Sequence, residues 1–159
     1  MTQEDKELLL QDLCARLPYR VKCSFGVDDA VYEITGVNPT CCGASEIQAT
    51  HVKSSVNGDF RLNSCKPYLF PLSSMTEEQK QELFELCRFC IEEDWEGKKR
   101  EVYAIAISSR ADPAYCFDHN FYMWGVDIRA IDWLNKNHFD YRGLIEKGLA
   151  IDCTNLNIY

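Results

Sequence analysis

The sequence predicts an α+β fold, in which an N-terminal helix precedes a small antiparallel, barrel-like sheet and a mainly helical C-terminal part. Three observations support this prediction. Apolar residues up to Leu17 recur at helical spacing, the next stretch alternates with a period of two, and a second helix signal begins at Thr76. The chain has 159 residues, of which 46% are apolar and 26% are charged, which is ordinary for one compact domain.

The first helix is predicted from its cap and its end. Thr2 and Asp5 stand three positions apart, as the partners of an N-terminal capping box do, and Pro18 is expected to end the helix. Beyond Pro18 the apolar positions recur every second residue, which predicts strands over about 20–25 and 30–37.

The rest of the sheet is predicted from its turn residues. Residues 46–55 and 60–65 flank Asn57-Gly58, a pair that suits a type I′ turn, so a hairpin is expected there. Residues 66–72, held extended by two prolines, are expected to form an edge strand or an exit arm. Short strands joined by tight turns after a leading helix predict a small antiparallel sheet that curls toward a barrel.

The part of the chain after residue 75 is predicted to be mainly helical. Thr76 and Gln79 form the clearest capping box in the sequence, and the helix that they open is expected to run to about Glu93. Further helices are expected over 127–137 and 141–147, the second ending before a glycine.

We expect one domain over residues 1–159, with a β-rich part at about 18–72 and a mainly helical part at about 76–159. Residues 102–107 are a continuous apolar run, interpreted as a buried strand, although so short a run also fits a helix. A small sheet of polar strands is marginal by itself, so a fragment of residues 1–75 is expected to stay unfolded.

Charge and cysteine content limit the partners and the compartment. The net charge is −8, from 17 Lys and Arg against 25 Asp and Glu, so neither nucleic acid nor an anionic membrane is expected as a partner. The first residues lack the pattern of a signal peptide, and no stretch has the length of an apolar membrane span, which predicts a cytoplasmic protein. Nine cysteines without an export signal are expected to be reduced thiols.

Two segments carry a resemblance to a group of known sequences. KPYLFPLSSMTEEQK at 66–80 and DWLNKNHFDYRGLIEKGLAID at 132–152 resemble the hallmarks of an uncharacterised family of short proteins from gut anaerobic bacteria and their phages and prophages. The segment LLLQDLCARLPYRVKC near the N-terminus also fits, whereas the stretch from Glu96 to Asn120 departs from the family pattern. The resemblance implies a β-rich N-terminal part, an acidic helix and a mobile-element setting, and it brings no catalytic residue with it.

One group of side chains has the composition of a metal site. Cys87 and Cys90, followed later by Cys116 and His119, have the ligand types and the local spacings that zinc uses. However, both cysteines of the first pair lie on the apolar stripe of the predicted helix, where free cysteine packs as a small hydrophobic residue. Structural zinc and core packing are therefore the alternatives here, and no other cofactor is indicated.

An aromatic segment is the second candidate site. Its large side chains are Tyr115, Phe117, Phe121, Tyr122 and Trp124. Such a cluster with few charges is typical of a protein interface, and it could also form the wall of a small-ligand pocket or part of the domain's own core. The acids Glu92, Glu93 and Asp94 are expected to add a negative face beside it.

No complete set of catalytic residues is visible in the sequence. His51, His119 and His138 are the only histidines, and His138 is expected either to cap its helix or to favour the helix C-terminus as a cation. Our hypothesis is a non-enzymatic interaction protein of a mobile element, which binds a host or phage protein through the aromatic segment and the acidic helix. The alternative is a small-ligand or structural-zinc-binding module.

Overall fold

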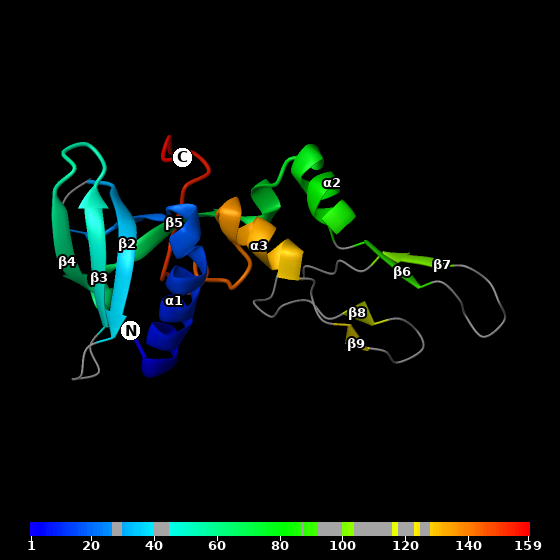
Figure 1. The fold of residues 1–159 in the computed structure, drawn as a ribbon, viewed down its shortest axis with the longest axis horizontal. Helices are drawn as coiled ribbons and strands as arrows, with labels where there is room; N and C mark the ends of the chain where they lie inside the picture. Colours follow the sequence, from blue (N-terminus) through cyan, green and yellow to red (C-terminus); the bar gives the residue numbers. More distant parts are fainter. Residues whose placement is uncertain are drawn as a thin grey trace.

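A computed structural model describes residues 1–26, 30–39, 45–86, 88–91, 100–103, 116–117, 123–124 and 128–159. The helices are α1 (Gln3–Arg16), α2 (Glu77–Leu86) and α3 (Ile128–Lys136), with short 3-10 turns at Leu17–Tyr19, Leu62–Ser64 and Leu72–Ser74. The strands of the main sheet are β1 (Lys22–Ser24), β2 (Tyr32–Pro39), β3 (Ser45–His51), β4 (Asn57–Arg61), β5 (Lys66–Pro71), β10 (Phe139–Asp140) and β11 (Ile151–Asp152). The predicted α+β class is confirmed (Figure 1).

The main sheet is mixed and open. Its strand order is β10-β5-β1-β2-β3-β4, and β11 also pairs with β5. The strands from β5 to β4 are antiparallel to their neighbours, whereas β10 and β11 run parallel to β5. Among the described residues β4 pairs with β3 alone, so the sheet is not closed. The predicted sheet is therefore present, but it is open and does not form a barrel.

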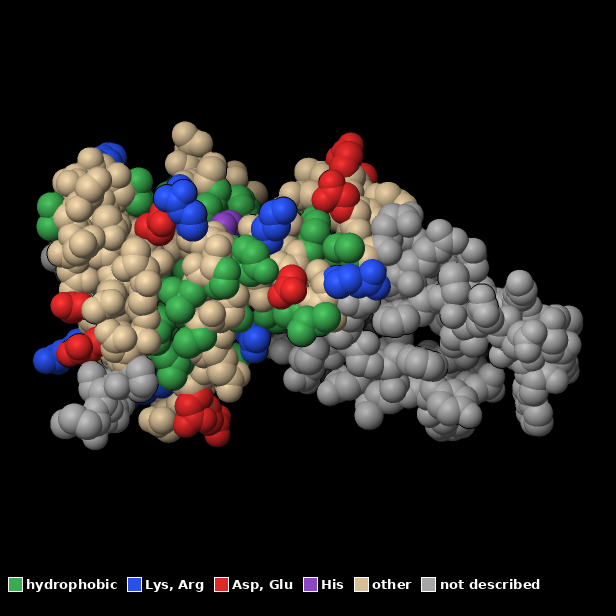
Figure 2. All heavy atoms as spheres, in the orientation of Figure 1, with side chains coloured by type: hydrophobic (Ala, Val, Ile, Leu, Met, Phe, Trp, Pro, Cys, Tyr) green, Lys and Arg blue, Asp and Glu red, His purple; other side chains and the backbone are tan. Residues whose placement is uncertain are grey.

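Helix α1 covers one face of this sheet. Its predicted capping box is present, because the Thr2 N–H donates to Asp5 Oδ2 at 2.9 Å and the Asp5 N–H donates to Thr2 Oγ1 at 3.1 Å. Leu9 and Leu13 of α1 are fully buried. They share one core cluster with buried residues of the strands and of the chain on either side of β1, namely Val21, Cys23, Phe25, Ile34, Ile47 and Ala49. On the face drawn in Figure 2, hydrophobic side chains follow α1 and α3, and acidic side chains lie over α2.

The hairpin of β3 and β4 turns earlier than predicted. Asn57 and Gly58 lie inside β4, opposite Thr50 and Ala49, and the turn is formed by residues 52–55. The ring of Phe60 explains the difference. It stacks on Phe25 at 3.8 Å and lies over Gly58, where a Cβ atom would be 2.9 Å from the ring. Burial of this aromatic pair fixes the register, and the turn signal of Asn57-Gly58 is overridden.

Strand β5 is central, and the prediction of an edge strand is wrong. Its two prolines stand near the ends of the strand and leave the N–H groups of Tyr68 to Phe70 available for pairing. The Phe70 N–H donates to the His138 carbonyl at 2.9 Å, and the Cys153 N–H donates to the Leu69 carbonyl at 3.0 Å. β5 therefore joins the β-rich part of the chain to the C-terminal part.

Two helix predictions also need correction. α2 ends at Leu86, and Arg88–Ile91 forms β6, which pairs with β7 (Arg100–Tyr103). Residues 141–147 form turns, because the Asp140 carboxylate accepts the N–H groups of Leu144 at 3.0 Å and Ile145 at 2.7 Å. In a continuous helix those N–H groups would bond to carbonyls one turn earlier. Of the predicted 102–107 strand, residues 102–103 belong to β7 and the rest lie outside the described residues.

Among the described residues, no helix combines the length and the apolar character that crossing a membrane requires.

Candidate functional site

Helices α2 and α3 form a packed base. The predicted capping box opens α2, since the Thr76 N–H donates to Gln79 Oε1 at 2.9 Å and the Gln79 N–H donates to Thr76 Oγ1 at 3.2 Å. Leu83 of α2 is buried in one cluster with Ala130 and Leu134 of α3. We call α2, α3 and this shared cluster the helical base.

Polar contacts of α3 with α2 reinforce the helical base. Trp133 Nε1 donates to Glu82 Oε2 at 3.1 Å, and the Trp133 ring stacks on Phe139 at 5.7 Å with an angle of 9° between the planes. Arg129 Nη2 donates to the Leu86 carbonyl at 3.4 Å. Leu86 is the last residue of α2 and Arg129 is in the first turn of α3, so the two ends of segment 87–127 meet at the helical base.

Segment 87–127 holds both sites that the sequence predicts. Its described residues form two separate two-stranded sheets, β6–β7 and β8 (Cys116–Phe117) with β9 (Met123–Trp124). Figure 1 shows these strands on the far side of α2 and α3 from the main sheet. The candidate binding segment is therefore attached through the helical base, in the described part of the chain.

The structure places only part of the predicted aromatic site. Pairing of β8 with β9 sets Phe117 opposite Met123 and Cys116 opposite Trp124. The other predicted binding residues, Tyr115, Phe121, Tyr122, Glu92, Glu93 and Asp94, lie outside the described residues. Because α2 ends at Leu86 and β6 follows it, the three acids do not belong to α2, and the expected acidic helix is shorter than predicted.

The structure separates the described members of the predicted zinc set by element. Cys90 lies on β6 and Cys116 lies on β8, in different two-stranded sheets, while Cys87 and His119 lie outside the described residues. In the part of the chain that the structure describes, no three Cys, His, Asp or Glu side chains are grouped as metal ligands would be. The zinc site stays a prediction.

A hollow of about 500 Å³ lies beside the start of α2. Its lining includes Phe70, Ser74, Thr76, Lys136, His138 and Tyr159. The His138 ring stacks on Tyr159 with centroids 3.9 Å apart, and its Nδ1 atom is buried without a hydrogen-bond partner. Burial, together with the cationic Arg16 and Lys22, lowers the pKa of His138 to about 4. His138 is therefore neutral at pH 7, and the expected cation at the end of α3 is wrong.

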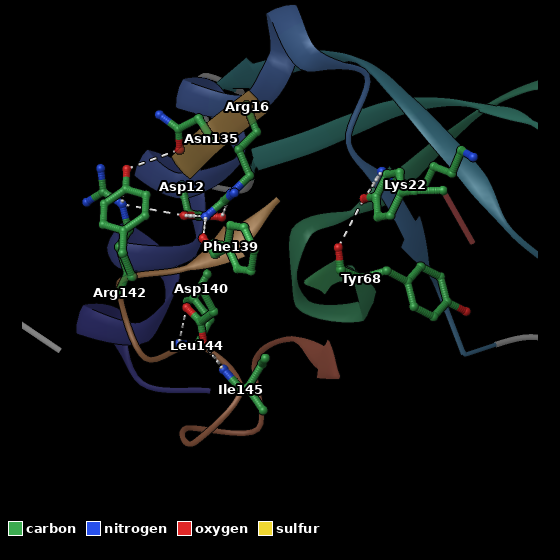
Figure 3. A network of polar contacts seen from close by, with 12 residues as sticks. Asp12, Arg16, Lys22, Tyr68, Asn135, Phe139, Asp140, Arg142, Leu144 and Ile145 are labelled. Carbon is green, nitrogen blue, oxygen red and sulfur yellow. Dashed lines mark hydrogen bonds and ion pairs between the residues drawn. The ribbon is translucent and has the colours of Figure 1, made fainter. Parts of the chain in front are cut away.

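Tyr159 is inserted between two strands of the main sheet. In the β1–β5 register, Lys22 stands opposite Tyr68. Instead of bonding directly, the Lys22 N–H donates to the Tyr159 hydroxyl at 3.0 Å, and that hydroxyl donates to the Tyr68 carbonyl at 3.0 Å (Figure 3). The Lys22 ammonium also donates to the Ile158 carbonyl and lies 5.1 Å from the Tyr159 ring centroid. Burial of the hydroxyl raises the pKa of Tyr159.

A fully buried ion pair links α1 to the segment after α3. Arg16 Nε lies 2.7 Å from Asp12 Oδ2, and Arg16 Nη2 donates to the Phe139 carbonyl at 2.8 Å (Figure 3). Arg142 Nε lies 3.4 Å from Asp12 Oδ1, and both arginines lie over the Tyr141 ring. This cluster was not predicted from the sequence, although Asp12 and Arg16 are one turn apart on the buried side of α1.

His51 organises a turn. Its Nδ1 accepts the Ser54 N–H at 3.0 Å and lies 2.5 Å from Ser54 Oγ, and its ring meets Tyr32 edge-on. Because Nδ1 is committed to the backbone of the same turn, this His–Ser contact is a local turn motif, and the side chain is half-buried rather than freely solvated.

Comparisons with protein-family models, with curated proteins and with solved structures found no match to this chain.

Proposed function

We propose that this protein is a non-enzymatic interaction protein that binds a host or phage protein through segment 87–127. The observation that carries the proposal is the Arg129–Leu86 contact, which brings both ends of this segment together on the packed helical base. Long segments between secondary-structure elements that are positioned by a packed scaffold often carry binding residues.

The composition of the segment supports the same function. Tyr122 and Trp124 belong to an aromatic cluster of the kind that dominates binding energy at interfaces. Glu92, Glu93 and Asp94 add negative charge at another part of the segment, which raises association rates more than affinity. The host or phage setting of the partner rests on the sequence resemblance alone.

Excision of the segment tests the proposal. Because Leu86 and Arg129 are in contact, residues 88–126 can be replaced by a short Gly-Ser linker. The excised protein is expected to keep a cooperative thermal transition and to lose the partner that the full chain captures from a host lysate. The partner is then purified and its binary affinity measured, so that capture alone does not decide the matter.

Point variants locate the binding energy within the segment. Tyr122→Ala combined with Trp124→Ala is expected to weaken binary binding by about 10-fold or more. Leu156→Ala, a change of an exposed apolar residue elsewhere, is the matched control and should leave binding unchanged. Equal binding by the aromatic double variant and the wild type would remove the aromatic cluster from the interface.

Salt dependence separates an aromatic contact from an acidic decoy. Binding through the aromatic cluster is expected to survive a change from low to physiological ionic strength, whereas a contact built on many charges weakens steeply. If charge reversal at Glu92, Glu93 and Asp94 abolishes binding and Trp124→Ala does not, the acidic decoy mechanism replaces the one proposed.

A second candidate function is a small-ligand module, favoured by the hollow beside α2. Its volume of about 500 Å³ and its stacked His138–Tyr159 pair suit a flat ligand. Native mass spectrometry of the purified protein, with elemental analysis for zinc, tests both forms of this alternative. A measured mass equal to that of the polypeptide alone, together with a zinc content near zero, would exclude this alternative.

A further inference from the structure

Strand β4 presents an unpaired backbone edge. The His51 N–H donates to the Val56 carbonyl at 2.9 Å, which fixes the hydrogen-bonding pairs between β3 and β4. Since these pairs alternate along an antiparallel ladder, Gly58 and Phe60 point their backbone groups at β3. The backbone groups of Asn57, Asp59 and Arg61 point away from β3, where no other strand pairs with them in the described residues.

The side chains on this edge have opposite charges two residues apart. Asp59 and Arg61 are exposed and share the polar face of the sheet. A single kind of charge on an edge strand discourages strand addition. Opposite charges at positions i and i+2 behave differently, because they are complementary to the same sequence running in the opposite direction.

We propose that two copies of this chain associate through antiparallel pairing of their β4 strands, with a two-fold axis at Phe60. In this register each Asp59 stands opposite Arg61 of the other copy, in a hydrogen-bonded pair. The Arg61 carbonyl already accepts the Ser64 hydroxyl at 2.8 Å, and its second lone pair serves the new bond. The main sheet then continues through the dimer.

Charge selects this register over its neighbour. A shift by one residue would place the two Asp59 side chains directly opposite each other, which is destabilising. With the axis at Phe60 both cross-strand positions hold an Asp–Arg pair, and the Phe60 rings stay on the covered face, where they stack on Phe25. The interface is separate from segment 87–127, so it does not depend on the proposed function.

Charge exchange on the full chain tests the dimer. Light scattering coupled to size exclusion is expected to show a monomer–dimer equilibrium that shifts with protein concentration. Asp59→Arg and Arg61→Asp are each expected to weaken the dimer about 10-fold or more, because each places like charges opposite each other. The double exchange restores the Asp–Arg pairs and should restore the dimer. Lys53→Glu, in the adjacent turn, is the control and should change nothing.

A proline variant tests the backbone pairing. The Asp59 N–H points away from β3, so Asp59→Pro removes a donor to the second copy and none to β3. It is expected to be monomeric with a cooperative melt. A wild type that stays monomeric at every concentration, or a dimer that resists both single exchanges and the proline, overturns the proposal. A double-exchange variant that fails to restore the dimer also overturns the proposal.

Discussion

The two sides of the main sheet are held together in different ways. From β1 to β4, each strand pairs with its neighbour in sequence, and the inner face is filled by apolar side chains under α1. On the β5 side, the pairing partners β10 and β11 come from far along the chain. Arg16 of α1 donates to the Phe139 carbonyl of β10, and Tyr159 accepts the Lys22 N–H of β1. The β5 side has apolar clusters of its own around Leu69 and Phe139, and Leu8 of α1 packs against the first. What distinguishes this side is that specific polar contacts also join it to α1 and β1.

The largest expected effect comes from the buried ion pair that joins the two sides. Arg16→Leu leaves the Asp12 carboxylate buried with Arg142 as its remaining cation, at 3.4 Å. We expect a loss of about 3–5 kcal/mol in the free energy of unfolding, measured by chemical denaturation. Replacing both partners by apolar residues, Asp12→Leu with Arg16→Met, should recover most of that loss.

The surface pair of Arg20, which follows the first 3-10 turn, and Glu33 of β2, 2.9 Å apart, provides the matched control. Glu33→Gln is expected to leave the unfolding midpoint within experimental error, since exposed ion pairs contribute little. Equal losses from the buried and the exposed pair would mean that the Asp12–Arg16 cluster does not join the two sides.

The next effect is a dependence of stability on pH. The pKa of His138 is about 4 in the folded protein against 6.5 in the unfolded chain, because burial and nearby cations disfavour its charged form. The unfolded chain therefore binds a proton first as the pH falls. The stabilising contribution of neutral His138 is complete above pH 6.5 and decreases from there to about pH 4, by up to about 3 kcal/mol.

His138→Phe keeps an aromatic ring against Tyr159 and removes this titration. The difference in unfolding free energy between wild type and variant, followed by denaturation from pH 7 to pH 4, should change in favour of the variant as the pH falls. Parallel profiles for the two proteins would contradict the neutral, buried state of His138.

The smallest expected effect is at Tyr159. Tyr159→Phe removes the hydroxyl that bridges the Lys22 N–H and the Tyr68 carbonyl, which leaves both groups without that partner. We expect a loss of about 1–3 kcal/mol and faster hydrogen exchange at the Lys22 amide. Amides of β3 that exchange through local opening should keep their wild-type exchange rates, because the hydroxyl contacts only β1 and β5. An unchanged exchange rate at the Lys22 amide would show that β1 and β5 pair directly at this position when the hydroxyl is removed.

The same contrast explains which elements the sequence could predict. The starts of α1 and α2 depend on capping partners three residues apart, Thr2 with Asp5 and Thr76 with Gln79, and both predictions are confirmed. The predictions for β5 and for residues 141–147 are wrong, because the bonds that decide them come from distant residues or from the side chain of Asp140. Local signals were sufficient for the two helix starts, whereas after Asp140 a nearby side chain replaces the helical bonds that the sequence pattern predicts.

The candidate site follows the same rule. The aromatic residues from Tyr115 to Trp124 were found by composition, and their role stays a prediction. His138 and Tyr159 were not grouped by any pattern, since the stacking that brings them together depends on β5 and β10 being adjacent. The spacing of Asp12 and Arg16 on α1 was the one sequence signal that could have indicated a buried polar cluster.

The central position of β5 has a consequence for the order of events during synthesis. β5 lies at residues 66–71, but its parallel partners end at residue 152. The Lys22 N–H likewise bonds to a hydroxyl that lies 137 residues later in the chain. While the ribosome is still adding those residues, one side of β5 has no strand to pair with. The nascent chain then exposes an apolar strand until residues 139–152 have been synthesised, and this interval is when chaperone binding or misassembly is expected to compete with folding.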